Sequence, residues 1–483
     1  MVEEQKSLTR NFLYNLFQQG LNVALPLLTV PYLSRVLGPE GLGLVAFSGS
    51  IVQYFILLGG MGLALYGNRA VARVRQDNEE RSRTFWEIFS LRASLTTIAL
   101  FCFLISLLAF KPAHIEVYIV QSVLILASAL DLSWLFMAME DFKRIAIRNT
   151  AIRLVGLALI FILVRQPGDF VKYVLITVLT ELAGQGVYWT RIRSLVQRPE
   201  MGKLSLGRHL PPAGRLFVPQ LAIQVYVVLD KTMLGLLSNL AEVALYAQPQ
   251  KIIKALLMLV TTLGTVMLPR MSHLYANKRE GEFRDYARKS LLFTLYGTFL
   301  FSALTFVISP AFIPLFLGKD FSRSVIVFQL LSPIIVLIGL SNVLGIQMLL
   351  PMGKERLFSV SVITGAVVNF SGNLVLIPLY GATGAAVSTL LAEFLVTAIQ
   401  CFSLRRDGIF PGLYKEFSCF LIGSASCIAV SLPLKTLISN PVTLTGLSCL
   451  SGTAAYIAAL WLCRSETQRA IFKHILKTFG GVA

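Results

Sequence analysis

The sequence predicts an all-α integral membrane protein with about fourteen transmembrane helices. Three observations carry this prediction: an excess of apolar residues, a series of apolar runs long enough to span a bilayer, and an uneven distribution of basic residues between alternate loops. Of the 483 residues, 55% are hydrophobic and only 14% are charged, and the mean hydropathy is +0.71. Soluble domains contain about 25% charged residues, so this composition suits a surface that faces lipid.

The apolar runs define the predicted helices. A helix needs about 20 residues to cross the hydrocarbon layer of a bilayer. The connections between the runs are short, so we expect no separate soluble domain, and any function must reside within the helical bundle. The predicted runs are residues 12–33, 43–66, 87–110, 115–139, 146–164, 171–190, 216–237, 242–268, 290–310, 325–350, 357–378, 382–403, 414–434 and 443–463.

The basic residues predict the orientation of the chain. The formal net charge is +18. If the N-terminus lies in the cytoplasm, 31 lysines and arginines fall in the predicted cytoplasmic segments and 7 in the segments on the opposite side. Cytoplasmic loops of membrane proteins are enriched in these residues, so the bias predicts that both termini are cytoplasmic. Membrane orientation explains the basic charge, and we expect no nucleic-acid partner.

The sequence contains no recognisable catalytic or metal-binding motif. The six cysteines lie in or beside apolar runs without the paired spacing of a zinc or redox site, and the four histidines are far apart. P-loop, GxGxxG and HExxH patterns do not occur. We therefore expect no catalytic residues, no metal ligands and no cofactor.

Five basic residues lie within the predicted helices: Arg92, Arg153, Lys231, Lys251 and Lys254. Each would cost about 2.5–3.5 kcal/mol if it faced lipid near the bilayer centre. We therefore expect them to line an interior cavity and to bind the substrate. The alternative is that buried ion pairs merely fix the helix register, with these carboxylates as candidate partners: Asp131, Glu181, Asp230, Glu242 and Glu393.

Uncharged polar residues also recur at helical spacing. Asn15, Gln18 and Asn22 share one face of the first run, and Gln224 shares a face with Lys231. These polar faces predict a hydrated lumen, although they could instead hydrogen-bond to neighbouring helices. Further pairs at this spacing are Asn149 with Arg153, Glu181 with Gln185, and Asn369 with Asn373.

The excess of cations at membrane depth favours an anionic substrate group. Diphosphate oxygens accept charge-assisted hydrogen bonds from lysine and arginine, whereas an exporter of organic cations would need the opposite balance of charge. The carboxylates Asp230, Asp131 and Glu181 are candidates for binding a coupling ion, either Na⁺ or H⁺.

Three stretches carry a family resemblance. They are NFLYNLFQQGLNVALPLLTVPYLSRVLGPEGLGLVAF, QVYVVLDKTMLGLLSNLAEVALYAQPQKIIKALLMLVTTLGTVMLPRMS and VLIPLYGATGAAVSTLLAEF. On these stretches, the chain resembles the polysaccharide-exporter branch of the MOP superfamily, which includes Wzx-type O-antigen and capsule flippases and teichoic-acid flippases. The resemblance extends over nearly the whole chain.

The resemblance implies two pseudo-symmetric six-helix bundles around a central cavity, residues 1–200 and 201–405. Two additional transmembrane helices and a cytoplasmic tail would follow in residues 406–483. It implies a flippase in a bacterial cytoplasmic membrane that moves an undecaprenyl-diphosphate-linked oligosaccharide, a precursor of cell-surface polysaccharide or teichoic acid, between leaflets by alternating access. The expected partners are this lipid-linked glycan, membrane lipids and a complex with a glycan polymerase or transferase. We expect the chain to be monomeric.

The resemblance also implies roles for individual residues. The stretch LDKTMLG places Asp230 and Lys231 on the seventh helix, and QPQKIIKA places Lys251 and Lys254 on the eighth. These resemble lumen positions, and Lys231 is the strongest candidate for a diphosphate contact. The related lipid II flippases carry arginine in their first helix, where this chain has only amides. That departure favours a glycan repeat over a peptidoglycan precursor as the substrate.

Two other functions remain open at this point. A MATE-like ion-coupled antiporter of small molecules comes from the same superfamily and predicts a lumen dominated by acidic residues. A membrane enzyme, such as a glycan polymerase or ligase, usually needs a large extracytoplasmic loop that holds catalytic groups. The sequence shows no loop of that length between its apolar runs.

Overall fold

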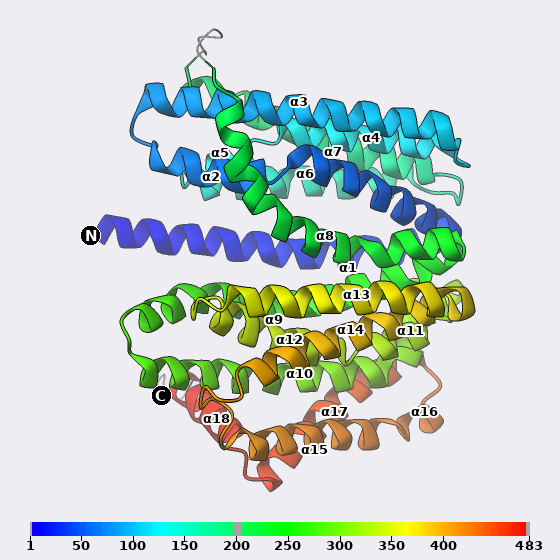
Figure 1. Ribbon diagram of the computed structural model, residues 1–483. Helices are drawn as coiled ribbons and strands as arrows, with labels where there is room; N and C mark the ends of the chain where they lie inside the picture. Colours follow the sequence, from blue (N-terminus) through cyan, green and yellow to red (C-terminus); the bar gives the residue numbers. More distant parts are fainter. Residues whose placement is uncertain (1, 198–203, 480–483) are drawn as a thin grey trace. The chain divides into compact units, whose positions relative to one another are not determined.

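The computed structural model describes residues 2–197 and 204–479. It describes side chains over the same ranges apart from residues 2–24, 26, 142–144, 146–147, 218–219, 222–223, 225–226, 259, 262–266 and 474–479. All regular secondary structure in the described ranges is helical (Figure 1). The chain divides into two compact units, Met1–Leu236 and Leu237–Ala483, and each unit has its own buried core.

The first unit contains helices α1 to α8. Their bounds are α1 (Val2–Gly60), α2 (Leu63–Arg73), α3 (Asn78–Phe110), α4 (Ile115–Leu130), α5 (Ser133–Ala138), α6 (Phe142–Leu163), α7 (Phe170–Trp189) and α8 (Leu210–Leu237). Short 3-10 helices precede α8 at Ile192–Ser194 and Gly207–His209.

The helical path of α1 is interrupted at Gly38. This residue has φ 65° and ψ −176°, a conformation that glycine adopts readily and that residues with a side chain avoid. The predicted runs 12–33 and 43–66 are therefore two helical halves that meet at this glycine.

The predicted run 115–139 is likewise two helices, α4 and α5, which are separated at Asp131. This residue has extended backbone angles, φ −69° and ψ 115°. Its carboxylate accepts hydrogen bonds from the backbone N–H and the hydroxyl of Ser133, each at 2.9 Å. The first N–H groups of α5 have no partner within their own helix, and the carboxylate of Asp131 satisfies one of them. In a continuous helix these N–H groups would already be bonded to the preceding turn.

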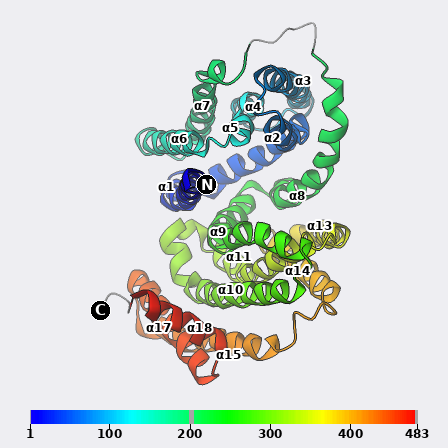
Figure 2. The same ribbon diagram turned by 90° about the vertical axis from the view of Figure 1, so that its left-hand side faces the viewer.

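α8 links two sides of the first unit (Figures 1 and 2). Before its first residue, Ser205 N–H and His209 Nε2 each donate to the buried carboxylate of Glu87 on α3 at 2.8 Å. Near its end, the Thr232 hydroxyl donates to Ser50 Oγ of α1 at 2.9 Å. α8 is therefore fixed to α3 at one end and to α1 at the other.

The second unit contains helices α9 to α18. Their bounds are α9 (Leu240–Ala276), α10 (Glu280–Leu317), η4 (Lys319–Phe321), α11 (Ser324–Leu331), α12 (Ile334–Ser341), the π-helix η5 (Asn342–Leu349), α13 (Glu355–Tyr380), α14 (Ala382–Ser403), α15 (Leu413–Ser431), α16 (Leu434–Leu437), α17 (Pro441–Leu462) and α18 (Glu466–Phe479).

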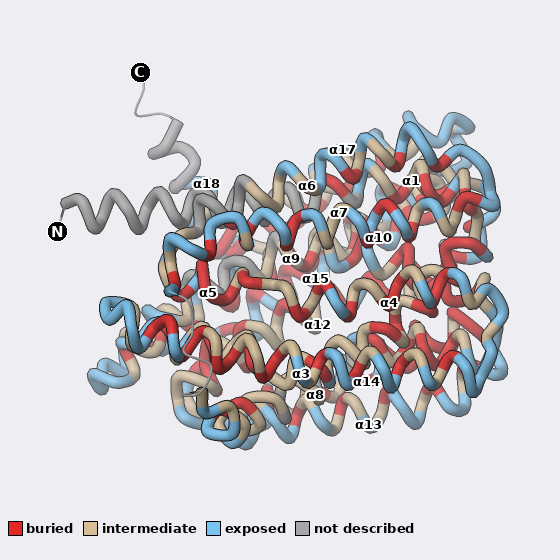
Figure 3. The backbone as a smooth tube through the Cα atoms, turned by 90° about the horizontal axis from the view of Figure 1, so that it is seen from above, coloured by how far each residue is buried: buried red, intermediate tan, exposed pale blue. Residues whose placement is uncertain are grey.

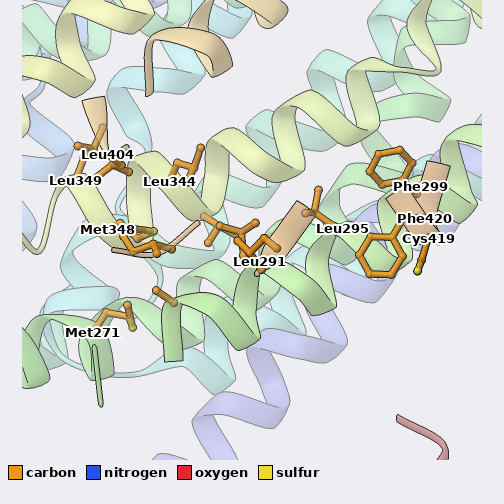
Figure 4. Close-up of a cluster of buried hydrophobic side chains, with 14 of the residues drawn as sticks. Met271, Leu291, Leu295, Phe299, Leu344, Met348, Leu349, Leu404, Cys419 and Phe420 are labelled. Atoms are coloured by element: carbon orange, nitrogen blue, oxygen red, sulfur yellow. The ribbon is translucent and has the colours of Figure 1, made fainter. Parts of the chain in front are cut away.

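The core of the second unit is formed mainly by α9, α10, η5, α15 and α17. Figure 4 shows part of this core, with Met271 and Met348 toward one end and Phe299 and Phe420 at the other. The Tyr456 hydroxyl of α17 donates to the carbonyl of Tyr296 on α10 at 2.9 Å. These contacts hold α15 and α17 against α10.

Exposed apolar stripes indicate which helix faces meet lipid. On α3, Ile98, Phe101, Ile105 and Leu108 are 59–72% exposed and lie three or four residues apart, so they share one face. Figure 3 shows such exposed positions along the outer helices. A water-soluble protein would not expose an apolar stripe of this length.

The all-α membrane fold is confirmed, whereas the number of spans stays a prediction. Ten described helical segments are long and apolar enough to cross a membrane. The predicted runs 146–164, 216–237 and 242–268 coincide with α6, α8 and α9, each of which includes side chains outside the description. The helices α2 and α18 extend beyond the predicted runs. The predicted division at residues 200 and 405 also stays a prediction.

Candidate functional site

The first unit contains a polar cavity of about 560 Å³. It is bounded by the second half of α1 and by α3, α4, α5, α6 and α7. Its polar lining is unusual for a space among apolar helices, because burying a polar group without a partner is costly. The polar lining residues are Gln53, Arg92, Ser128, Asp131, Ser133, Arg148, Asn149, Arg153, Glu181, Gln185 and Tyr188.

Arg92 on α3 meets the junction between α4 and α5. Arg92 is only 6% exposed, and one terminal nitrogen of its guanidinium donates to the main-chain carbonyl of Asp131 at 3.0 Å. The other lies 3.7 Å from the Asp131 carboxylate. Among the described residues, the buried Nε of Arg92 has no hydrogen-bond partner. This N–H can donate a hydrogen bond to a ligand oxygen.

Arg148 on α6 is held by three groups from α6 and α7. Its Nε donates to the carbonyl of Gly184 at 3.0 Å, and its terminal nitrogens donate to Asn149 Oδ1 at 2.7 Å and lie 3.4 Å from Glu181 Oε1. The guanidinium also lies 4.6 Å from the centre of the Tyr188 ring, a cation–π geometry. Arg148 is therefore positioned before any ligand arrives.

Glu181 on α7 connects α7 to α6. Its Oε1 accepts a hydrogen bond from Gln185 Nε2 at 2.7 Å in addition to its pairing with Arg148. Arg153 lines the same cavity and interacts electrostatically with both Glu181 and Arg148. Gln185 Oε1 and the Tyr188 hydroxyl are buried without hydrogen-bond partners among the described residues.

The charge of the cavity is positive. Among its described lining residues, three arginines accompany two carboxylates. The distances of 3.4 and 3.7 Å between guanidinium and carboxylate exceed the roughly 2.7–2.9 Å of a strong charge-assisted hydrogen bond. A phosphate oxygen could therefore bond to a guanidinium more closely than these carboxylates do, and the planar guanidinium suits two-point contact with phosphate.

The structure places four of the predicted site residues in the lining of this cavity. Arg92, Arg153, Asp131 and Glu181 line the cavity. Asp230 is buried and Lys231 is partly buried on α8, and Lys251 and Lys254 are exposed on α9 of the second unit. Gln224 is exposed on α8. Asn15, Gln18 and Asn22 lie on α1, but their side chains are outside the described residues.

Several residues of the cavity region were not recognised as site residues from the sequence, among them Arg148, Tyr188 and Gly184. Arg148 was counted with the basic cytoplasmic segments, yet it lines the cavity six residues after the start of α6. Tyr188 and Gly184 on α7 have no charge and gave no signal. For Arg148, the signal was its neighbour Asn149, which lies one turn before Arg153 on the same face of the helix.

Glu242, a candidate partner for the predicted lumen cations, bonds to groups of its own unit. Glu242 accepts a hydrogen bond from the backbone N–H of Ala382 at 2.8 Å and pairs with Arg323. It therefore joins α9 to the start of α14 within the second unit.

The polar face at Asn369 and Asn373 contributes to bonding between helices. The Asn369 amide donates to Thr389 Oγ1 at 3.4 Å, and the Tyr246 hydroxyl lies 3.0 Å from the same oxygen. These side chains come from α13, α14 and α9. For this face, the structure favours interhelical hydrogen bonding, the alternative to a hydrated lumen.

Comparisons of sequence identify relatives over most of the chain. Residues 8–275 match the family model described as "Polysaccharide biosynthesis protein". A proposed O-antigen transporter of Escherichia coli (strain K12) is 28% identical over 84% of this chain and 99% of its own length. A proposed O-antigen transporter of Shigella dysenteriae is 27% identical over 80% of this chain and 97% of its own length.

Comparisons of structure identify the fold. The lipid II flippase MurJ in an inward closed conformation superposes with a TM-score of 0.75 at 14% identity, over 96% of this chain and all of that one. An inward-facing multidrug resistance MATE family transporter of the MOP superfamily superposes with a TM-score of 0.60 at 14% identity, over 79% of this chain and 94% of that one. At these identities, the likeness establishes the architecture alone.

Proposed function

Because the chain belongs to the polysaccharide biosynthesis protein family, whose model matches more than half of it, we propose that it is a flippase for a lipid-linked oligosaccharide. The superfamily predicted from the sequence is confirmed by this match. The proposed substrate is an undecaprenyl-diphosphate-linked oligosaccharide that moves from the inner to the outer leaflet of a bacterial cytoplasmic membrane. The O-antigen transporters among its relatives support this substrate class.

The observation that carries the proposal is the arginine-lined cavity of the first unit. Arg92, Arg148 and Arg153 lie among apolar helices, where a cation needs an anionic partner or water. A diphosphate offers oxygens that three guanidinium groups can share. The sugars would occupy hydrated space, while the isoprenoid tail would stay in lipid.

Transport by this route needs no covalent step. Arg92 would use its unpartnered Nε, and Arg148 would exchange its weak contact with Glu181 for a phosphate oxygen. The bond from Arg148 Nε to the Gly184 carbonyl would keep that guanidinium in place during the exchange. The chain would therefore act as a carrier that alternates between openings to the two sides and not as an enzyme.

The carboxylates of the cavity suit a role in ion coupling. If a phosphate oxygen replaces the carboxylate of Asp131 or Glu181 as the partner of a guanidinium, that carboxylate loses its counter-ion in an apolar setting. It then favours binding H⁺ or Na⁺. Substrate and coupling ion would then be linked through a shared arginine. Asp230, next to Lys231, is the other candidate for this role.

The remaining predicted residues would contribute outside this cavity. We propose Lys231, Lys251 and Lys254 as further contacts for the anionic headgroup. The polar face of Asn15, Gln18 and Asn22, together with Gln224, would contact sugar hydroxyls. We further propose that the protein is a monomer with both termini in the cytoplasm and that it works beside a glycan polymerase or transferase. Teichoic acid precursors belong to the proposed substrate class.

The second candidate function is a MATE-like antiporter, which shares the fold. Such a protein would bind organic cations and would need acidic groups to dominate its binding site. Among the described lining residues of the cavity, the arginines outnumber the carboxylates. This balance favours the anionic substrate.

The decisive experiment deletes the gene and identifies the accumulated undecaprenyl-linked intermediate by mass spectrometry. We expect a completed lipid-linked repeat unit to accumulate and the wild-type gene to restore export. At equal amounts of folded protein, Arg92→Gln, Arg153→Gln and Lys231→Gln should each restore less export than Lys289→Gln, which alters a residue with a 74% exposed side chain. Unchanged levels of every undecaprenyl-linked glycan after deletion would contradict the proposal.

A further inference from the structure

The second unit contains an apolar cavity of about 510 Å³. It is bounded by α10, by the junction of α11 and α12, by α14 and by α15. Phe299 and Phe306 of α10, Val336 of α12, Phe394 of α14 and Ile428 of α15 are among its lining residues. Its volume lies within the range of about 300–1,000 Å³ that is usual for small-ligand sites.

The lining offers few groups that would recognise a polar ligand. None of its described residues is charged. Three serines provide its only described polar side chains. The hydroxyl of Ser332 donates to the carbonyl of Gln329 at 2.8 Å, and that of Ser424 donates to the carbonyl of Phe299 at 3.2 Å, which leaves the single hydroxyl of Ser302 for a ligand. A sugar or a phosphate would lose its hydration here with little compensation. This lining therefore suits a hydrocarbon ligand.

Sequence features explain why the space exists. Pro333 cannot donate a backbone hydrogen bond, and the helical path breaks there between α11 and α12. On the facing side, α10 presents the small residues Ser302 and Ala303. An empty space of this size would leave the surrounding side chains without contacts on one side, which is costly. Occupancy by a chain would restore those contacts.

The mouth of the cavity lies on a surface that faces lipid. Leu391 and Phe394 of α14 are 51% and 59% exposed, and α14 is one of the segments apolar enough to cross a membrane. Hydrocarbon is therefore the medium at this opening. Bulk phospholipid is by far the most abundant source of hydrocarbon chains in a bilayer, so mass action favours it over a scarce isoprenoid lipid.

We propose that this cavity binds one acyl chain of a bilayer phospholipid, which completes the packing of the second unit beside Pro333. The bound chain would touch α10, α12, α14 and α15 together and would stabilise their arrangement. The site is independent of the transported glycan, and so the proposed function and this proposal can fail separately.

The test measures how added lipid changes the thermal unfolding temperature of the full-length protein in detergent. Dioleoyl phosphatidylglycerol should raise this temperature in the wild type by preferential binding to the folded state. The substitutions Ser302→Leu and Val336→Phe fill the cavity from two different helices, and each should abolish most of the increase. Val367→Phe, at a 59% exposed position of α13, adds similar bulk elsewhere and should leave the increase intact.

Native mass spectrometry of the same proteins gives a second measurement. We expect one fewer retained phospholipid in each filled variant than in the wild type and in Val367→Phe. An unchanged lipid-dependent increase in both filled variants would overturn the proposal. So would an increase that undecaprenyl phosphate produces and phospholipid does not, because that result would assign the site to an isoprenoid chain.

Discussion

The guanidinium of Arg92 lies 3.7 Å from the carboxylate of Asp131 but only 3.0 Å from the main-chain carbonyl of the same residue. The carboxylate in turn is held by the backbone N–H and the hydroxyl of Ser133. The position of Arg92 therefore does not depend on the charge of Asp131. The main-chain carbonyl of Asp131 therefore positions Arg92, whereas the carboxylate of Asp131 balances its charge.

Asp131→Asn should consequently leave Arg92 in place and remove its counter-charge. Two unit charges about 4 Å apart interact by about 4 kcal/mol at an effective dielectric constant of 20, and solvent in the cavity reduces this figure. We expect pyrophosphate to bind the purified variant about three- to tenfold more tightly, a change of about 1 kcal/mol, as measured by calorimetry. Weaker binding at full folded yield would contradict the assignment of Arg92 to the anion site.

Arg148→Lys should reduce flipping although it keeps the charge. Arg148 uses separate nitrogens for the Gly184 carbonyl, for Asn149 and for Glu181, and an ammonium group cannot reproduce this planar fork. We expect at least about a tenfold lower flipping rate in proteoliposomes that contain a fluorescent lipid-diphosphate substrate. The matched control is Arg284→Lys, since Arg284 pairs with Glu280 on the exposed surface of the second unit. Equal rates for the two variants would place Arg148 outside the transport site.

Gly184→Ala should disturb the same site by crowding. A Cβ atom at this position would collide with the side chains of Arg148 and Ile152, whereas a Cβ at Gly186 would meet no atom within 4 Å. Both residues lie on α7, and alanine is better than glycine in a helix by about 1 kcal/mol. We expect Gly186→Ala to transport normally and to unfold at a slightly higher temperature. Gly184→Ala should transport several-fold more slowly, and normal transport by it would show that Arg148 can move without loss.

The fold was predictable because hydrophobicity and basic charge act over many residues at once. Every predicted apolar run coincides with helix, since no other backbone arrangement but a closed barrel satisfies its hydrogen bonds in lipid. The break at Asp131 was not predicted, because it depends on one residue and on what packs beside it, whereas the break at Gly38 lies between the predicted runs 12–33 and 43–66. The pairs α4 with α5 and α11 with α12 each lie within a single predicted run, residues 115–139 and 325–350.

The site was predictable only in its charged part. A charge within an apolar run is costly wherever it faces lipid, and this rule identified Arg92, Arg153, Asp131 and Glu181 without any structure. It could not identify Arg148, which lies so near the start of α6 that it resembled a loop residue. It also grouped Lys251 and Lys254 with the arginines, and these two lysines lie on α9 of the second unit, so their role in the site stays a prediction. Sequence periodicity assigns a face to each helix but not the neighbour of that face.

The loop between α6 and α7 should respond to acid through Asp169. Lys172 lies 2.7 Å from its carboxylate, and the backbone N–H groups of Arg165 and Gln166 donate to it. These contacts, the ion pair with Lys172 foremost, lower the pKa of Asp169 to about 2. The carboxylate therefore stabilises the folded state at any pH above the unfolded-state pKa of about 3.9. This contribution is lost as the pH falls toward 2.

Asp169→Asn removes this contribution at neutral pH and should not affect flipping, since the residue is remote from the lining of the cavity. The difference in thermal unfolding temperature between wild type and variant should be constant from pH 7 to pH 5 and should shrink below about pH 4. A difference that grows in acid would mean that the carboxylate is protonated in the folded protein.

Glu87→Gln should loosen α8 without touching the cavity. The Glu87 carboxylate is buried and accepts hydrogen bonds from Ser205 N–H, from Arg208 and from His209, and it also pairs with Arg83 on its own helix. A neutral amide has one acceptor oxygen where the carboxylate has two, and it leaves buried donors unpaired at a cost of about 1–3 kcal/mol. Tyr66, which contacts His209 at 2.9 Å, would keep the imidazole in place, so the helix should loosen at its start and not detach. Hydrogen exchange at residues 204–215 should accelerate at least about tenfold, while exchange around Thr232, at the other end of α8, should change little. If both ends of α8 exchanged faster to the same extent, the helix would be held as one unit, and Glu87 would not be a local anchor.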